Sequence, residues 1–491
     1  MEHIRSSPNV AEGKTTAYNG ALVSMLTRRT NDVNVPSLLR FVVFAVSLGF
    51  IPVCIYAETP TTQTDAAKAG YEFIRSTPLL PTDFDQETFE AVWKEWPEPL
   101  RSQAEQASPA ERRRMAFERY GLIEPPESDG TGPALGYVDD GQGGWVMNCL
   151  ACHSGQVAGQ TIPGVPNTNF ALQTMTEELR IAKARLQKPF SSKDLAIFKL
   201  SLGSTNGTTN AVVFGILLGS LRDADLNYVR GSQAPPRTDH DMDAPPFWNV
   251  KKKSRLYCDG HSPKNHRVLV QFMLMPVNDA EMIKSKENDF RNVLAWIESL
   301  EAPKYPWEID AKLAKRGEQV FNANCSECHG TYGEKETYPE KAIPIDVVGT
   351  DPLRLHALKP IDRQKLAESW MCNYGEDEVE TEPVGYVAPP LDGIWASAPY
   401  FHNGSVPTLW HVLHPDQRAT VWRRTSTGYD RERVGLEVQT YDNVPANVSS
   451  VVEQRRYFDT RKPGKSGQGH DFPASLTEPE KAAVLEYLKT L

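Results

Sequence analysis

A short pattern, Cys-x-x-Cys-His, occurs twice in this chain of 491 residues and limits its fold more than any other feature. The copies are Cys149-Leu-Ala-Cys152-His153 and Cys325-Ser-Glu-Cys328-His329. This spacing lets two thiols form thioethers to the vinyl groups of one haem while the adjacent imidazole reaches its iron. A dithiol redox pair or half of a zinc site leaves the histidine unexplained. The sequence therefore predicts two covalently bound haems c.

The segment ahead of both motifs indicates export. Residues 41–57 are almost wholly apolar, and several arginines precede them. The stretch is shorter than the about 20 residues that a membrane helix needs, and Pro52 interrupts it. We expect residues 1–57 to be a signal peptide, with Met25 as an alternative start, and the protein to be periplasmic or secreted. A retained membrane anchor is the alternative.

The overall charge argues against one class of partner. Lys and Arg total 53 against 63 for Asp and Glu, so the formal net charge is -10. Binding to nucleic-acid phosphates requires a basic surplus. We therefore expect no nucleic acid, and the acidic balance favours a small basic electron donor, either a cytochrome or a cupredoxin.

Amphipathic segments divide the chain into domains. Residues 289–300 carry apolar side chains on one helical face, and Pro303 ends that pattern. This predicts an N-terminal haem c domain over 58–302 with a long insertion, and a C-terminal cytochrome c domain over 303–491. Within the insertion, two stretches read as loops around one short apolar segment, at residues 201–220 and 233–246. No period-two run for a large sheet is visible, so we expect a mainly α fold of two cytochrome c-like domains in tandem with long loop insertions.

The C-terminal domain is predicted in most detail. Residues 311–324 form a helical pattern that runs into the second motif, and residues 477–491 begin with a capping-box spacing. A helix leading into Cys-x-x-Cys-His and a terminal helix crossing it resemble the cytochrome c fold. In that arrangement Gly317 permits a close crossing and Tyr487 lies against Phe321.

Longer segments carry a family resemblance. The stretch from Gly385 to Leu409 (GYVAPPLDGIWASAPYFHNGSVPTL) looks like the bacterial dihaem cytochrome c peroxidase superfamily. Three further pieces resemble the branch that contains the rubber oxygenases and their uncharacterised dihaem relatives, namely residues 244–257, 349–354 and 457–472. The resemblance covers the chain from about residue 144 to its end.

Each haem needs iron ligands. Spacing assigns His153 and His329 as proximal ligands, but it cannot choose among the other histidines. The resemblance implies that His470 closes the second haem from its far side. His402 and Met371 are the competing candidates.

The resemblance also implies roles around the first haem. An aromatic pair, Phe247 and Trp248, would line its distal pocket and provide an electron route between the haems, although such a pair is often only a core plug. Lys251 and Arg255 would offer cations to haem propionates, or they are simply part of a surface charge run. His261 stands where the rubber-oxygenase branch has a distal aromatic residue, and a distal histidine would favour peroxide chemistry. The alternative is that His261 is only a hydrogen-bonded loop histidine.

These expectations combine into one function with two alternatives. The first haem would be open and activate hydrogen peroxide, and the second would relay electrons. The alternatives are an oxygenase that cleaves an apolar substrate with dioxygen, and an electron carrier with both irons closed. The sequence leaves open the oligomeric state, a calcium ion between the domains, and whether Cys258 and Cys372 pair or stay as separate thiols.

Overall fold

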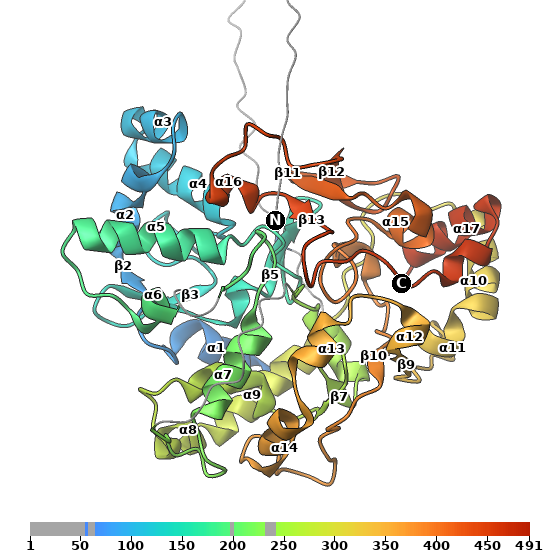
Figure 1. Ribbon diagram of the computed structural model, residues 1–491, viewed down its shortest axis with the longest axis horizontal. Helices are drawn as coiled ribbons and strands as arrows, with labels where there is room; N and C mark the ends of the chain where they lie inside the picture. Colours follow the sequence, from blue (N-terminus) through green and yellow to red (C-terminus); the bar gives the residue numbers. More distant parts are fainter. Residues whose placement is uncertain (1–54, 57–63, 197–200, 231–241) are drawn as a thin grey trace, which may run out of the picture. The chain divides into compact units, whose positions relative to one another are not determined.

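The computed structural model describes residues 55–56, 64–196, 201–230 and 242–491. The predicted signal peptide and the start at Met25 lie almost entirely outside these residues. All the described residues fall within one compact unit, Val53–Leu491, which contains both Cys-x-x-Cys-His motifs. Figure 1 shows the helices and strands of this unit. The predicted domain boundary after residue 302 remains a prediction.

The described helices are mostly short and are spread along the whole of this unit. They are α1 (Asp65–Ser76), α2 (Gln86–Ala91), α3 (Leu100–Gln106), α4 (Pro109–Tyr120), α5 (Leu172–Arg185), α6 (Ser192–Ala196), α7 (Ala211–Ser220), α8 (Ala280–Ser285), α9 (Glu287–Ser299), α10 (Ala311–Asn324), α11 (Ser326–His329), α12 (Ile345–Val348), α13 (Leu353–Ala357), α14 (Pro360–Glu368), α15 (Leu409–Leu413), α16 (Val451–Gln454) and α17 (Glu478–Leu488). Helix α7 lies within residues 201–220, a stretch that was expected to be loop around a short apolar segment. Most of the other expected loop, 233–246, lies outside the described residues.

The strands form several small sheets with the orders β1-β6-β5, β2-β4-β3, β7-β8, β10-β9 and β12-β11-β13. They are β1 (Ile55–Tyr56), β2 (Phe84–Asp85), β3 (Tyr137–Asp139), β4 (Gly144–Met147), β5 (Ser154–Val157), β6 (Gln160–Pro163), β7 (Arg255–Leu256), β8 (Ser262–Pro263), β9 (Ala342–Pro344), β10 (Gly385–Val387), β11 (Val421–Asp430), β12 (Gly435–Tyr441) and β13 (Phe458–Asp459).

The prediction of a mainly α fold is wrong, because the structure is 41% helix and 13% strand and is a mixed α/β fold. Most strands have only two to four residues, which is too short to show a period of two. The longest pair, β11 and β12, has an irregular register between Arg424 and Tyr429, and that irregularity breaks the alternation of buried and exposed residues.

The helix crossing predicted for the C-terminal region is confirmed (Figure 1). Helix α17 opens with the capping box between Thr477 and Glu480, and α10 crosses it at Gly317. A Cβ at Gly317 would collide with the carbonyl oxygen of Ala483, so only glycine allows this approach. The rings of Phe321 and Tyr487 lie beside the crossing, 5.3 Å apart.

A second helix pair repeats this design in the N-terminal region. Helix α1 packs on α9, and a Cβ at Gly70 would collide with the carbonyl of Asn292. Tyr71 stacks on Trp296 with ring centroids 5.2 Å apart. The predicted helix at 289–300 is therefore confirmed as α9, and its partner α1 had not been foreseen. None of the helices in the described residues is long and apolar enough to cross a membrane.

Candidate haem-binding sites

The first motif is held in a tight turn. Cys149 begins a 3-10 turn that ends at Ala151, and the Asn148 side chain accepts a hydrogen bond from the Leu150 amide at 2.8 Å. The carbonyl of Cys152 accepts from the amide of Asn167 at 2.8 Å. These hydrogen bonds therefore fix the backbone of the segment that carries both thiols and the following histidine.

The His153 ring is prepared to bind a metal. Its Nδ1 lies 3.1 Å from the carbonyl oxygen of Pro245. A carbonyl can only accept, so Nδ1 carries the proton and Nε2 keeps its lone pair. Burial lowers the pKa of His153 to about 4, so the ring is neutral at pH 7. Metal-binding histidines commonly have such a donor contact on the other nitrogen.

The second motif repeats this arrangement at the end of a helix. Helix α10 leads into Cys325, and Cys328 and His329 lie on the short helix α11. His329 Nδ1 donates to the carbonyl oxygen of Pro389 at 2.9 Å. Burial lowers the pKa of His329 as well, so its Nε2 is also free to coordinate.

The two carbonyl acceptors share a sequence signal that our sequence analysis did not use. Pro245 is the first proline of Ala244-Pro-Pro, and Pro389 is the first proline of Ala388-Pro-Pro. Each tripeptide supplies the carbonyl that orients one motif histidine. Ala-Pro-Pro also occurs at residues 234–236, so the tripeptide alone would not have identified the two acceptors, although two of its three copies supply them.

His470 lies opposite His329. The two ring centroids are 6.1 Å apart with an interplanar angle of 63°. Two imidazoles on one iron have their centroids about 6 Å apart, because each metal–nitrogen bond is about 2 Å and each ring adds its own radius. The pair therefore fits a haem iron between its rings. His470 Nδ1 is buried without a hydrogen-bond partner among the described residues, and burial with the nearby His329 and Arg418 lowers the pKa of His470 to about 3.

The backbone on either side of His470 packs closely against another loop. Gly469 packs directly on Gly349, where a Cβ would collide with the Gly349 carbonyl group. The His470 amide then donates to the carbonyl of Val348 at 2.6 Å. Arg418 Nη1 donates to the carbonyls of Gly467 and Gly469 at 2.8 and 2.6 Å. These contacts fix the loop that presents His470, which has a positive φ of 52°.

The competing ligand candidates have other ring or core contacts. His402 packs on the ring of Tyr386 at 4.3 Å, and Met371 is buried in the apolar core. Three further histidines have partners in the protein. These are His266 with Glu287, His411 with Thr408, and His414 with Trp410 and Glu478. Another histidine, His240, is outside the described residues.

Phe247 and Trp248 lie on the His153 side of the first site. Phe247 stacks on the His153 imidazole with centroids 3.9 Å apart and an angle of 17°. A ring stacked on the proximal imidazole is beside the ligand, so Phe247 does not have the distal position that we expected. Trp248 Nε1 donates to the carbonyl of Asp392 at 2.7 Å, three residues from Pro389. The aromatic pair therefore links the two motif histidines.

His261 belongs to a separate buried cluster. Its Nδ1 lies 2.8 Å from Asp259 Oδ1, and its ring stacks on Tyr257 at 4.5 Å. Asp259 also binds Arg354 and Arg363. Among the described residues, no hydrogen bond or ring contact links His261 to His153. The expected role of His261 beside the first haem thus remains a prediction without a contact to support it.

The cations expected at haem propionates have protein partners in this structure. Lys251 Nζ binds Glu301 at 2.7 Å. Arg255 Nη2 donates to the carbonyl of Glu378 at 2.9 Å. Neither side chain is left free for a propionate.

The remaining expectations concern thiols and calcium. Cys258 and Cys372 are both free thiols, and the Cys372 sulfur lies 3.7 Å from the hydroxyl of Ser262. Within the described part of the chain, no three His, Cys, Asp or Glu side chains form a group that could hold a metal ion, so calcium gains no support.

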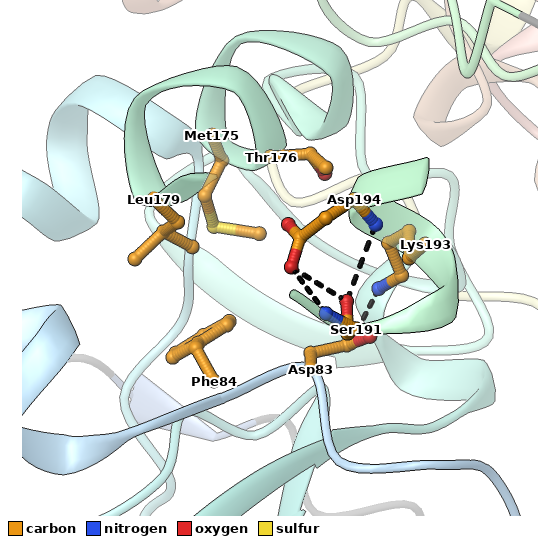
Figure 2. A pocket seen from close by; sticks show the side chains of 8 residues that line it. All are labelled: Asp83, Phe84, Met175, Thr176, Leu179, Ser191, Lys193 and Asp194. Atoms are coloured by element: carbon orange, nitrogen blue, oxygen red, sulfur yellow. Dashed lines mark hydrogen bonds and ion pairs between the residues drawn. The ribbon is translucent and has the colours of Figure 1, made fainter. Parts of the chain in front are cut away.

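A small buried cavity lies close to the first motif (Figure 2). Lys193 binds Asp83 there, and its Nζ is also 3.7 Å from the Met147 sulfur. Asp194 binds Lys183 and accepts from the Ser191 amide at 2.7 Å. Two lysines meet two aspartates, so the charges of this cluster balance, and we interpret it as structural.

One segment of the chain matches the model of a known protein family. Residues 385–423 match the family model described as RoxA-like, cytochrome c-like. This segment contains Pro389, which orients His329, and Arg418, which supports the His470 loop. The match relates the chain to RoxA-like c-type cytochromes and implies that it holds haem c.

Two curated relatives come from Sinorhizobium fredii, and both are uncharacterized. The protein y4iM is 29% identical over 254 residues, which cover 47% of this chain and 56% of the relative. The protein y4iJ is 28% identical over 259 residues, which cover 39% of this chain and 41% of the relative. The chain thus matches about half the length of these relatives.

Proposed function

We propose that this protein is a dihaem c-type oxidoreductase in which the haem at the first motif activates hydrogen peroxide and the haem at the second relays electrons. The observation that carries the proposal is the difference between ring partners. His329 has His470 opposite it, whereas the ring contact of His153 among the described residues is with Phe247. An iron held by two imidazoles has no position for a substrate, so the second site suits electron storage and transfer.

The contacts between the motif histidines support an electron route. Phe247 stacks on His153, and the next residue, Trp248, donates to the carbonyl of Asp392. Asn249 Nδ2 donates to the carbonyl of Pro390 at 3.0 Å, next to the Pro389 carbonyl that binds His329. Haem, when bound, supplies the redox centres, and these residues hold the two sites in a fixed relation.

The cellular setting belongs to the same proposal. Haem c is attached after export, so we infer a periplasmic or secreted protein. The net charge of -10 suits a small basic cytochrome or cupredoxin as electron donor.

A second candidate is an oxygenase that uses dioxygen on an apolar substrate. The match of residues 385–423 to a RoxA-like model favours it, because the sequence resembles the rubber-oxygenase branch. The placement of His261 also favours it. A peroxidase needs a base beside the open iron, and His261 is instead committed to Asp259.

The test uses the full-length, haem-loaded protein. Oxidised and half-reduced samples are mixed with peroxide in the presence of a reduced small cytochrome, and dioxygen uptake is followed separately with an apolar polymer. Our proposal predicts donor oxidation that depends on peroxide, which the double variant Cys149→Ala/Cys152→Ala abolishes. Dioxygen uptake with the polymer and no reaction with peroxide would replace the first candidate by the second. No reaction with either oxidant would leave an electron carrier.

A further inference from the structure

A buried ionic cluster lies apart from both motifs; we call it the Asp259 cluster, formed by Asp259, His261, Arg354 and Arg363. Asp259 Oδ2 accepts from Arg354 at 3.3 Å and from Arg363 at 3.1 Å, and Oδ1 binds the His261 ring. The four side chains are at most 3% exposed. Arginines buried this deeply require an explanation, because burial of charge is costly.

The charges of the Asp259 cluster do not balance. Burial raises the pKa of Asp259, but Arg354, His261 and Arg363 outweigh burial and hold that pKa well below its usual value, so Asp259 is ionised. Burial lowers the pKa of His261, so its ring is neutral at pH 7. Two guanidinium groups therefore share one carboxylate, and the cluster carries one excess positive charge. The cluster of Lys183, Lys193, Asp83 and Asp194 near the first motif has no such excess, because two lysines bind two aspartates.

The excess charge has an identifiable face. Nε and Nη2 of Arg354 are buried and have no hydrogen-bond partner among the described residues, and Nε of Arg363 is in the same condition. The Nε and Nη2 protons of an arginine point the same way and match the two oxygens of a carboxylate. Buried donors without partners are costly, so this face is complete only when an anion binds to it.

The Asp259 cluster adjoins the segments that hold the second haem site. Next to Asp259, the carbonyl of Cys258 accepts from the amide of Val387 at 2.8 Å, and Val387 is two residues from the Pro389 carbonyl that binds His329. Arg354 lies six residues after Val348, whose carbonyl accepts a hydrogen bond from the His470 amide.

Tyr386 connects these two segments. Its hydroxyl donates to the carbonyl of Asp351 at 2.7 Å and accepts from the amide of Leu355 at 3.2 Å. These contacts join the Asp259 cluster to the two segments that hold His329 and His470.

We propose that Arg354 binds a propionate carboxylate of the haem at the second motif through Nε and Nη2, with Arg363 and Asp259 as positioning residues. The inference rests on the proposed function, because it needs a haem at that motif. It gives the second haem a propionate-binding cation, whereas the sequence analysis placed Lys251 and Arg255 at the first haem. A carboxylate at this face would complete the arginine donors and neutralise the excess charge.

The test labels the haem alone. Cells grown on δ-aminolevulinic acid with carbon-13 in its carboxyl group produce haem whose propionate carboxylates carry the label, so a free organic carboxylate would give no labelled signal. Redox difference infrared spectra are compared between wild type, Arg354→Gln, Arg354→Lys and the matched control Arg119→Gln. Arg119 is also a buried arginine in an ion pair, with Glu178, far along the chain from the second site.

The inference predicts a shift of the labelled carboxylate bands in Arg354→Gln and in Arg354→Lys, and none in Arg119→Gln. The midpoint potential of the low-spin haem falls in Arg354→Gln, because loss of a positive charge favours the ferric state. It stays near wild type in Arg354→Lys, which retains the charge. A tenfold change in the oxidation equilibrium corresponds to about 59 mV for one electron.

Asp259→Asn provides an opposite sign. It removes the negative charge of the Asp259 cluster, so the potential should rise, which general disruption of the fold would not produce selectively. Labelled bands that are unchanged in folded, dihaem Arg354→Gln would overturn the inference. A chain without haem at Cys325 and Cys328 would instead overturn the proposed function.

Discussion

At both Cys-x-x-Cys-His motifs, the histidine donates from Nδ1 to the first proline carbonyl of an Ala-Pro-Pro segment. The two regions differ in the rings that contact these histidines. His329 faces His470, which a glycine–glycine contact and Arg418 hold in place. His153 instead has the ring of Phe247 stacked beside it. The two motifs therefore share one way of orienting the histidine and differ in its ring partner, and the proposed division of tasks between two haems rests on this difference.

The two helix pairs are also alike in their crossing, but they differ in how they connect to the motif. In the C-terminal region, α10 runs directly from its crossing with α17 into Cys325. In the N-terminal region, α1 crosses α9 in the same way, but residues 77–148 separate α1 from Cys149. That intervening chain, together with the insertion after His153, gives the first site surroundings that the second lacks.

The largest expected effect comes from removing one attachment at a time. Cys149→Ala/Cys152→Ala and Cys325→Ala/Cys328→Ala should each reduce haem from two to one per chain, because we propose that each motif holds its own haem. Haem staining of denatured protein and intact mass measure this. A wild type with fewer than two covalent haems would end the comparison of two haem sites.

His470→Ala should convert one haem from low-spin to high-spin while both stay attached, because thioether bonds do not depend on the distal ligand. Electron paramagnetic resonance of the ferric protein measures the change. His402→Ala is the matched control and should keep the low-spin signal, since His402 packs on Tyr386. If His402→Ala removed the signal and His470→Ala did not, the distal ligand would be His402.

The two helix crossings should respond alike to a methyl group. Gly317→Ala and Gly70→Ala each force a Cβ into a backbone carbonyl, and each should lower the free energy of unfolding by about 3 kcal/mol. Gly219→Ala in α7 is the control, because its nearest neighbour is the Leu274 side chain at 4.0 Å. Denaturant unfolding measures the differences. If Gly317→Ala or Gly70→Ala lowered the free energy of unfolding no more than Gly219→Ala does, that crossing would not be tightly packed.

Some parts of this structure could be predicted from the sequence and others could not. Helices α9, α10 and α17 follow from local signals, such as apolar periodicity and the Thr477–Glu480 capping box. The motif cysteines and histidines follow from covalent chemistry at fixed spacing. The Asp259 cluster could not be foreseen, because Arg363 is 104 residues from Asp259 and only the tertiary fold brings them together. His470 needed the family resemblance for the same reason.

Acid should affect the second site through its distal histidine. Burial, together with the nearby His329 and Arg418, lowers the pKa of His470 to about 3, against about 6.5 for an exposed histidine. Detached His470 binds a proton that the buried ring does not, so its native placement is fully stable above about pH 6.5 and weakens as the pH falls toward 3. The low-spin signal should decline over this window. In His470→Ala the spin state should be insensitive to it.

The smallest expected effect concerns the link between the sites. Trp248→Phe removes the hydrogen bond to the Asp392 carbonyl, which is worth about 1 kcal/mol. Electron exchange between the haems should slow, whereas ligand binding at the first haem stays near wild type. Flash photolysis of the half-reduced protein measures the exchange. An unchanged rate would assign Trp248 to the core alone.

Carbon monoxide binding to the fully reduced protein tests most directly the claim that one haem is open and the other closed. Ferrous haem binds this gas only where the iron has a free or weakly held position, and titration gives the number bound per chain. With one open and one closed haem, we expect one carbon monoxide per chain in wild type and two in His470→Ala. Two in wild type, or none, would contradict it.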